Sequence, residues 1–156
     1  MPELEIPLNP VSREDIHRLE AALMVATLLR EDVLEKIKES TERLTWIDSL
    51  AVAAGALARY KAGMSISEIA EDLGRSEATI RRHLQAKTEA GKLVQETYEK
   101  FLKEGVRVDL PRVLAERELE VEKQLEEEKK KIKELEEKLS RVRNLLETAL
   151  KELSDV

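Results

Sequence analysis

Residues 75–85 carry the side chains whose types and spacing could do chemistry in this chain. If residues 76–85 form a helix, Ile80 and Leu84 face inward and the opposite face is polar and charged. In the major groove of DNA, arginine can donate two hydrogen bonds to guanine, glutamine can pair with adenine, and glutamate can accept a hydrogen bond from cytosine. We therefore expect the outward-facing residues to contact base edges: Glu77, Thr79, Arg81, Arg82 and Gln85.

Groups suited to phosphate oxygens lie beside them. Short hydroxyls, basic side chains and helix N-termini bind phosphate and fix the position of a protein on DNA. The chain has 27 basic and 33 acidic residues and a net charge of −6, yet residues 75–94 hold five basic and two acidic residues, a local charge of +3. The average thus conceals a basic helix, and we expect phosphate contacts from Ser65, Ser67, Arg75, Ser76 and Lys87.

Two short helices joined by a tight turn must position these groups. Ser65 and Glu68 form the pattern of a capping box at the start of the first helix. Gly74 suits the left-handed conformation that a tight turn requires, and Ser76 can cap the second helix. Ala70 is small where the helices would cross, and Ile80 would fill the angle between them.

The string SISEIAEDLGRSEATIRRHLQ, residues 65–85, resembles the helix-turn-helix family of bacterial and archaeal DNA-binding regulators. The resemblance rests on Ile69-Ala70, Leu73-Gly74, residues 76–80 and His83-Leu84, and it covers residues 49–94 with the flanking helices. Arg75 is a minor departure, because that position is often apolar in the family. The resemblance implies a double-stranded DNA partner and a transcription regulator that reads the major groove with helix 76–90. A helical hairpin with a solvated charged face remains the alternative.

The regions around this motif are predicted to be helical. We expect an extended arm over residues 1–12, an N-terminal helix over 13–44 with a possible break near Arg30, and a helix-turn-helix domain over 45–105. Thr45 would cap the helix that precedes the motif, and the helix after Ser76 would run on towards Gly91. Because no Asn-Gly or Asp-Gly turn follows the motif, a β-wing is not expected. The predicted fold is all-α.

The tail, residues 109–154, is predicted to be one long coiled-coil helix. Apolar residues recur at steps of three and four over about five heptads, with Glu118 and Glu128 as polar interruptions. An intramolecular hairpin is possible, but a homodimer is favoured because this helix is longer than any other element. Lys131 opposite Glu136 would favour a parallel pair and Lys138 opposite Arg143 would not, so the orientation stays open. The predicted dimerisation residues are Val121, Leu125, Ile132, Leu135, Leu139, Val142, Leu146 and Leu153.

Composition excludes several other classes of protein. The chain has no cysteine, two histidines and no nucleophile elbow or Walker-type loop, so we expect no enzyme activity, no metal site and no cofactor. Neither a membrane span, a signal peptide nor an effector site is apparent, which predicts a cytoplasmic, nucleoid-associated protein. The abundance of glutamate, lysine and arginine is typical of thermophiles. The second functional hypothesis is a coiled-coil scaffold whose helix-turn-helix is a docking module or a weak DNA anchor.

Overall fold

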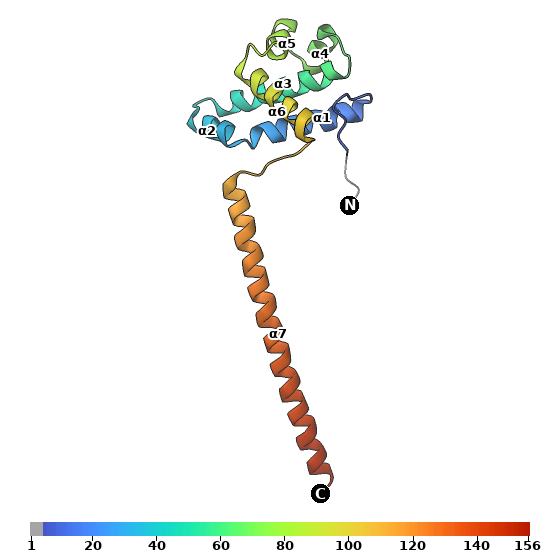
Figure 1. Cartoon of the computed structure of the whole chain (residues 1–156), viewed down its shortest axis with the longest axis vertical. Helices are drawn as coiled ribbons and strands as arrows, with labels where there is room; N and C mark the ends of the chain where they lie inside the picture. Colours follow the sequence, from blue (N-terminus) through green and yellow to red (C-terminus); the bar gives the residue numbers. More distant parts are fainter. Residues whose placement is uncertain (1–4) are drawn as a thin grey trace. The chain divides into compact units, whose positions relative to one another are not determined.

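The computed structural model describes residues 5–156, apart from the side chain of Val113, and it divides into two units at Pro111 (Figure 1). Nothing in the described residues 5–156 is a strand, so the chain is all-α and no β-wing follows the motif, as predicted. In chain order the helices are α1 (Arg13–Leu28), α2 (Glu31–Glu39), α3 (Arg43–Lys61), α4 (Ile66–Leu73), α5 (Glu77–Leu84), α6 (Glu89–Glu104) and α7 (Arg112–Ser154).

Helices α1, α3 and α6 pack on one another and enclose the main core of the first unit. α3, which has no charged residue between Asp48 and Arg59, is buried continuously from Val52 to Arg59. Its small side chains allow close approach, and large side chains such as Leu23 and Phe101 fill the space between the helices. Burial of a side chain of this size contributes about 1.5–3 kcal/mol. The core therefore holds α3 as a fixed platform for the helices that follow it.

The segment before α1 lies against this core. Ile6 and Leu8 pack on the main cluster, and the Tyr98 hydroxyl donates a hydrogen bond to the Leu8 carbonyl at 3.0 Å. Ser12 and Asp15 then form a capping box that starts α1. Of the extended arm predicted over residues 1–12, residues 5–12 form neither helix nor strand, and residues 1–4 lie outside the described residues.

The N-terminal helix predicted over residues 13–44 is divided into α1 and α2 at Leu29 and Arg30, where the sequence indicated a possible break, and α2 ends at Glu39. Arg30 adopts an extended conformation, with φ −60° and ψ 135°. Its guanidinium pairs with Asp32 at 2.8 Å and with Glu96 of α6 at 3.1 Å, which holds the break against the core. The next helix also begins earlier than predicted, with Glu42 rather than Thr45 at its N-cap position.

The second unit is the single helix α7, whose bounds agree with the predicted tail helix. All of its side chains that the structure describes are exposed, including the eight predicted dimerisation residues. Across residues 5–156 the helices are too short or too rich in charge to pass through a lipid bilayer.

Candidate nucleic-acid interface

The turn between α4 and α5 has the geometry that its sequence predicted. The Ser65 hydroxyl accepts from the Glu68 backbone N–H at 3.3 Å, and the Glu68 carboxylate accepts from the Ser65 backbone N–H at 2.8 Å. Gly74 ends α4 in the left-handed conformation, with φ 62° and ψ 40°. The Ser76 hydroxyl then accepts from the Thr79 backbone N–H at 3.2 Å and caps α5. Three local signals therefore fix the start and the direction of α5.

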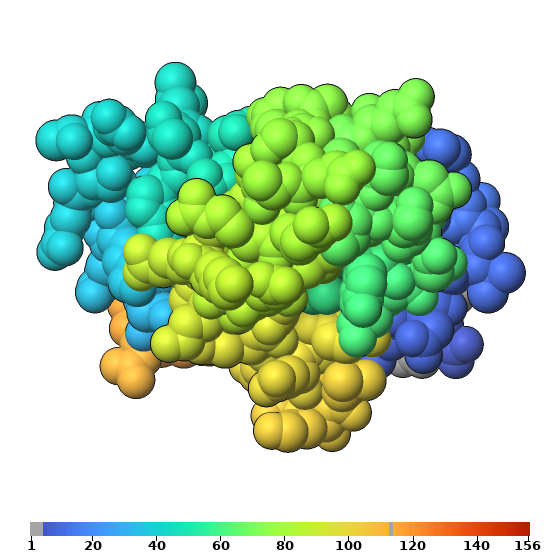
Figure 2. Space-filling view, turned by 90° about the horizontal axis from the view of Figure 1, so that it is seen from above, coloured from blue at the N-terminus to red at the C-terminus, as the bar shows by residue number. Residues whose placement is uncertain are grey.

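A second, smaller apolar cluster attaches this pair of helices to α3. Ile69 and Ala70 of α4 and Ile80 of α5 are buried against Val52 and Ala56 of α3. Both Ile80 and Ala56 are fully buried, which places one face of α5 against the platform and leaves the opposite face outward. Figure 2 shows α4 and α5, in green and yellow-green, running across one face of the first unit.

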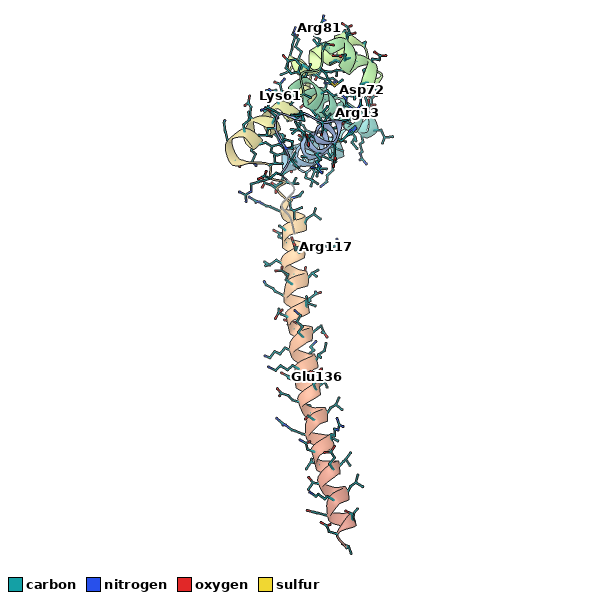
Figure 3. The ribbon with its side chains drawn as sticks, turned by 90° about the vertical axis from the view of Figure 1, so that its right-hand side faces the viewer. Arg13, Lys61, Asp72, Arg81, Arg117 and Glu136 are labelled. Atoms are coloured by element: carbon teal, nitrogen blue, oxygen red, sulfur yellow. The ribbon has the colours of Figure 1, made fainter. Side chains whose placement is uncertain are left out.

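Four of the five residues predicted to contact bases lie exposed on α5 or at its end: Glu77, Arg81, Arg82 and Gln85. Arg81 lies on the outer side of the domain, as Figure 3 shows, and its guanidinium is 3.4 Å from the Glu77 carboxylate. The fifth, Thr79, is less accessible because it is half-buried, and its hydroxyl shares a hydrogen bond with the Ser76 hydroxyl at 2.9 Å. The outward face of α5 thus combines two arginines, one carboxylate and one amide.

The five predicted phosphate contacts separate into three groups. Ser67 and Lys87 are exposed, and the Ser65 and Ser76 hydroxyls are engaged in capping. Arg75 is paired with Asp48 of α3, its guanidinium lying 2.9 and 3.1 Å from the two carboxylate oxygens. That ion pair ties the turn to the platform, and it means that Arg75 must leave Asp48, or share it, before it can bind a phosphate.

Helix α5 ends at Leu84, so the predicted continuation over residues 76–90 is wrong. The chain reverses through Ala86, which has a positive φ of 53°, and Thr88 starts α6 by accepting from the Gly91 backbone N–H at 3.0 Å. Gly91 lies where α6 meets the end of α5: a Cβ added there would be 2.3 Å from the His83 carbonyl oxygen. A longer α5 would therefore prevent this contact between α5 and α6.

His83 is a packing residue. It is 6% exposed, and its Nδ1 lies 2.7 Å from the Thr88 hydroxyl at the start of α6. Burial lowers the pKa of the imidazole, and the nearby charge of Arg82 lowers it further. The neutral ring therefore links the end of α5 to α6.

Sequence reasoning missed a buried arginine that joins three helices. Arg59 of α3 is 5% exposed, and its guanidinium bonds to Asp72 of α4 at 2.5 Å, to Glu20 of α1 at 3.1 Å and to the Gly55 carbonyl at 3.0 Å. The hydrogen bond from Arg59 holds the pKa of Asp72 below its ordinary value, and Arg13 contributes to the same shift. The sequence feature that could have revealed this residue is that Arg59 ends a stretch of α3 that is otherwise uncharged.

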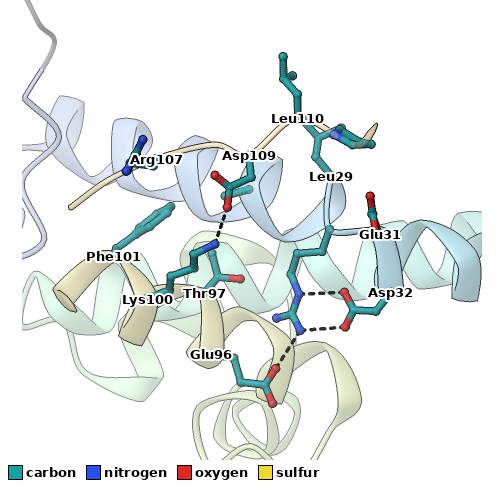
Figure 4. A pocket seen from close by; sticks show the side chains of 13 residues that line it. Leu29, Glu31, Asp32, Glu96, Thr97, Lys100, Phe101, Arg107, Asp109 and Leu110 are labelled. Atoms are coloured by element: carbon teal, nitrogen blue, oxygen red, sulfur yellow. Dashed lines mark hydrogen bonds and ion pairs between the residues drawn. The ribbon is translucent and has the colours of Figure 1, made fainter. Parts of the chain in front are cut away.

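The first unit also has a surface cavity of about 520 Å³ between α1, α6 and the segment that ends at Pro111 (Figure 4). Phe101 and Leu29 form apolar parts of its wall. Five of the charged residues that line it are paired with one another, Arg30 with Asp32 and Glu96, and Lys100 with Asp109. Within residues 5–156 no group of histidine, aspartate and glutamate side chains has an arrangement that could hold a metal ion.

Comparison with known proteins identifies this region. Residues 49–92, which run from α3 into the first turn of α6, match the family model of the homeodomain-like domain. A curated relative, the uncharacterized protein MJ1053 of Methanocaldococcus jannaschii, is 58% identical over 100 residues, which make up 64% of this chain and 61% of the relative. The chain thus matches less than two thirds of that relative, and no solved structure matches it. Residues 49–92 form a helix-turn-helix DNA-binding domain.

Proposed function

We propose that this chain is a sequence-specific DNA-binding protein that acts as a homodimer, and that it is a non-enzymatic regulator of transcription. The observation that carries the proposal is the outward face of α5, where Arg81, Arg82 and Gln85 are exposed within the homeodomain-like match. A helix of this type fits the major groove, and arginine and glutamine are the side chains that read guanine and adenine there. The operator would be an inverted repeat, because a symmetric dimer presents two such helices.

Phosphate contacts would orient α5 in the groove. The N-terminus of α5 is ordered by the Ser76 cap, and Ser67 and Lys87 are exposed near the two ends of the α4–α5 pair. Backbone N–H groups at a helix N-terminus and lysine side chains both bind phosphate without reading sequence. The negative charge of the whole chain would weaken non-specific binding, so that contacts in the groove decide affinity.

The dimer would form through α7. Its apolar seam, from Val121 to Leu153, is exposed along the described helix, and a helix with this pattern is stabilised when a partner covers the seam. A nucleoid-associated protein of thermophilic origin is part of the same proposal, supported by the ion-rich composition and by the relative from Methanocaldococcus jannaschii. The second candidate function is a scaffold that uses exposed residues of α7 to bridge partners, with the helix-turn-helix domain as its anchor on DNA.

Selection of bound sequences from random duplex DNA at physiological salt tests the regulator hypothesis. Enrichment of an inverted repeat is the expected result. On the selected DNA, Arg81→Ala or Arg82→Ala should each weaken binding by roughly 1–3 kcal/mol if the arginine contacts a base. The matched control is Arg43→Ala with Lys103→Ala, which removes two cations from exposed positions away from α5. Failure to enrich any sequence would favour the scaffold, and unchanged binding by a folded Arg81/Arg82 double variant would refute the role of α5.

A separate variant tests the dimer. Ile132→Lys with Leu139→Lys places two charges in the seam and should convert the dimer to a monomer in light scattering. Ser140→Lys with Asn144→Lys adds the same charge on the opposite side of the helix and should leave the mass unchanged. If the seam variant keeps the mass of the unmodified protein, α7 does not hold the dimer together.

A further inference from the structure

The apolar surface of α7 widens at its C-terminal end. In heptad notation the seam consists of the a positions, such as Leu139, Leu146 and Leu153, and the d positions between them. The flanking e and g positions are usually charged, but here Leu145 at g and Leu150 at e are leucines that are 70% and 66% exposed. A partner that covers this end must therefore bring apolar side chains to the edges of the seam as well as to its centre.

A second copy of α7 in parallel provides those side chains. In a parallel, in-register pair each g residue faces the e residue five positions later on the partner helix. Leu145 then faces Leu150 of the second copy, and because of the symmetry this contact forms on both edges. Two further pairs of this kind match in charge: Arg117 faces Glu122, and Lys131 faces Glu136.

An antiparallel pair of full overlap would place Ile132 opposite Leu135, and residues of the same heptad letter would then face one another at the edges. In that arrangement Lys131 lies opposite Lys138, two like charges. Leu145 lies opposite Gln124, and Leu150 lies opposite Ala115, so neither leucine meets a second large apolar side chain at the edges.

Two features oppose the parallel arrangement and are outweighed. Lys138 would face Arg143 of the second copy, and the seam glutamates Glu118 and Glu128 would face their own copies. Glu128 already has a local partner, since the Lys131 ammonium lies 2.7 Å from its carboxylate. Exposed charge pairs are worth only about 0–1 kcal/mol each, whereas burial of a leucine contributes about 1.5–3 kcal/mol. The two symmetric Leu145–Leu150 contacts therefore decide the orientation.

We propose that α7 pairs with a second copy of itself in parallel and in register, with Leu145 and Leu150 closing its C-terminal end. This inference rests on the proposed homodimer and adds its orientation. In a parallel pair both copies of Arg112 lie at the same end, so both DNA-binding domains are joined there. In a fully overlapped antiparallel pair the 43 residues of α7 would separate the two copies of Arg112 by roughly 65 Å, at 1.5 Å per residue.

Single cysteines test the orientation directly, because the full-length chain contains no other thiol. Val121→Cys and Ala149→Cys each change one d position, where a parallel pair brings the same residue of both copies together. A disulfide requires Cα atoms about 4.4–6.8 Å apart. The two sites are 28 residues apart along the helix, so no single antiparallel register can bring both into contact with their own copies. Ser140→Cys, on the outer side of the helix, is the matched control.

In a glutathione redox buffer, both d-position variants should run mainly as disulfide-linked dimers on a non-reducing gel, and the control should remain mainly as single chains. Light scattering of the reduced proteins is measured in parallel. If the mass is dimeric but either d-position variant fails to cross-link, the parallel arrangement is overturned and the proposed homodimer stays intact. A monomeric mass would overturn the homodimer, and cross-linking of the control to the same extent as the d-position variants would also refute the inference.

Discussion

The buried arginine of α3 offers a sharp test of how the helix-turn-helix domain is held in place. Arg59→Met keeps the length and the apolar part of the side chain but removes the charge that binds Glu20 and Asp72. The Arg59 side chain is 6% exposed, and the Glu20 and Asp72 side chains are 26% and 24% exposed. Removing one partner of a fully buried ion pair costs about 3–5 kcal/mol.

The expected cost here is smaller, because both carboxylates reach solvent and Asp72 keeps a second cation, Arg13, at 3.3 Å. We expect the free energy of unfolding to fall by about 2–3 kcal/mol. Urea unfolding of the two proteins at pH 7 and at the same protein concentration measures this difference in free energy. The signal is the fluorescence of Trp46, the single tryptophan, which packs against the main core of the first unit. Arg43→Met, at an exposed position, is the control and should change stability by less than about 0.5 kcal/mol.

The same substitution should change how stability depends on pH. The folded-state pKa of Asp72 lies below its ordinary value of 3.8, mainly because Arg59 donates a hydrogen bond to it. As the pH falls below 3.8 the unfolded chain takes up the proton first, so this contribution is present above pH 3.8 and is lost as the pH approaches the folded-state pKa. The difference between the unmodified protein and Arg59→Met should therefore shrink from pH 7 to pH 3. An equal difference at both pH values, or none at pH 7, would refute the reasoning.

Three further predictions concern the surroundings of α5. Gly91→Ala would place a Cβ 2.3 Å from the His83 carbonyl oxygen, so it should lower the free energy of unfolding, measured by urea denaturation, by about 1–3 kcal/mol. Lys92→Ala, the control, should change this free energy little. Because burial lowers the pKa of His83, the unfolded chain takes up that proton first as the pH falls below 6.5. His83→Gln should therefore flatten the loss of stability from pH 7 to pH 5. Asp48→Asn should free Arg75 and, if the domain binds DNA as proposed, raise the affinity for DNA measured by fluorescence anisotropy. The salt dependence of binding should steepen by about one phosphate contact. An unchanged slope would show that Arg75 does not reach the DNA backbone.

The features predicted correctly from the sequence depend on residues close together in the chain. Capping by Ser65 and Ser76 involves partners three residues away, and the conformation of Gly74 follows from its missing side chain. The face of α5 was predictable for the same reason, because the period of a helix places Ile80 inward and Arg81 outward.

The errors occurred where distant residues decide local structure. The sequence indicated no more than a possible break near Arg30, because the guanidinium that holds the break pairs with Glu96, 66 residues further along the chain. α5 stops at Leu84 because α6 approaches the His83 backbone at Gly91. Arg59 was missed because its partners, Glu20 and Asp72, come from two other helices. Neither periodicity nor capping patterns contain information about such contacts.

The charges around α5 explain why a dimer would matter for binding. Arg75 is held by Asp48 and Arg81 is close to Glu77, which leaves Arg82, Lys87 and Lys92 as the cations of residues 75–94 without an ion-pair partner among the described residues. Even if all three neutralised phosphates, the salt dependence would have a log–log slope of only about −3, typical of weak binding at physiological salt. Linking two domains makes the second binding event intramolecular, and avidity can then exceed either single affinity by about 10²–10⁴. If the chain pairs through α7 as proposed, its affinity for DNA should come mainly from that pairing, and the salt slope of the seam variant should be about half that of the dimer.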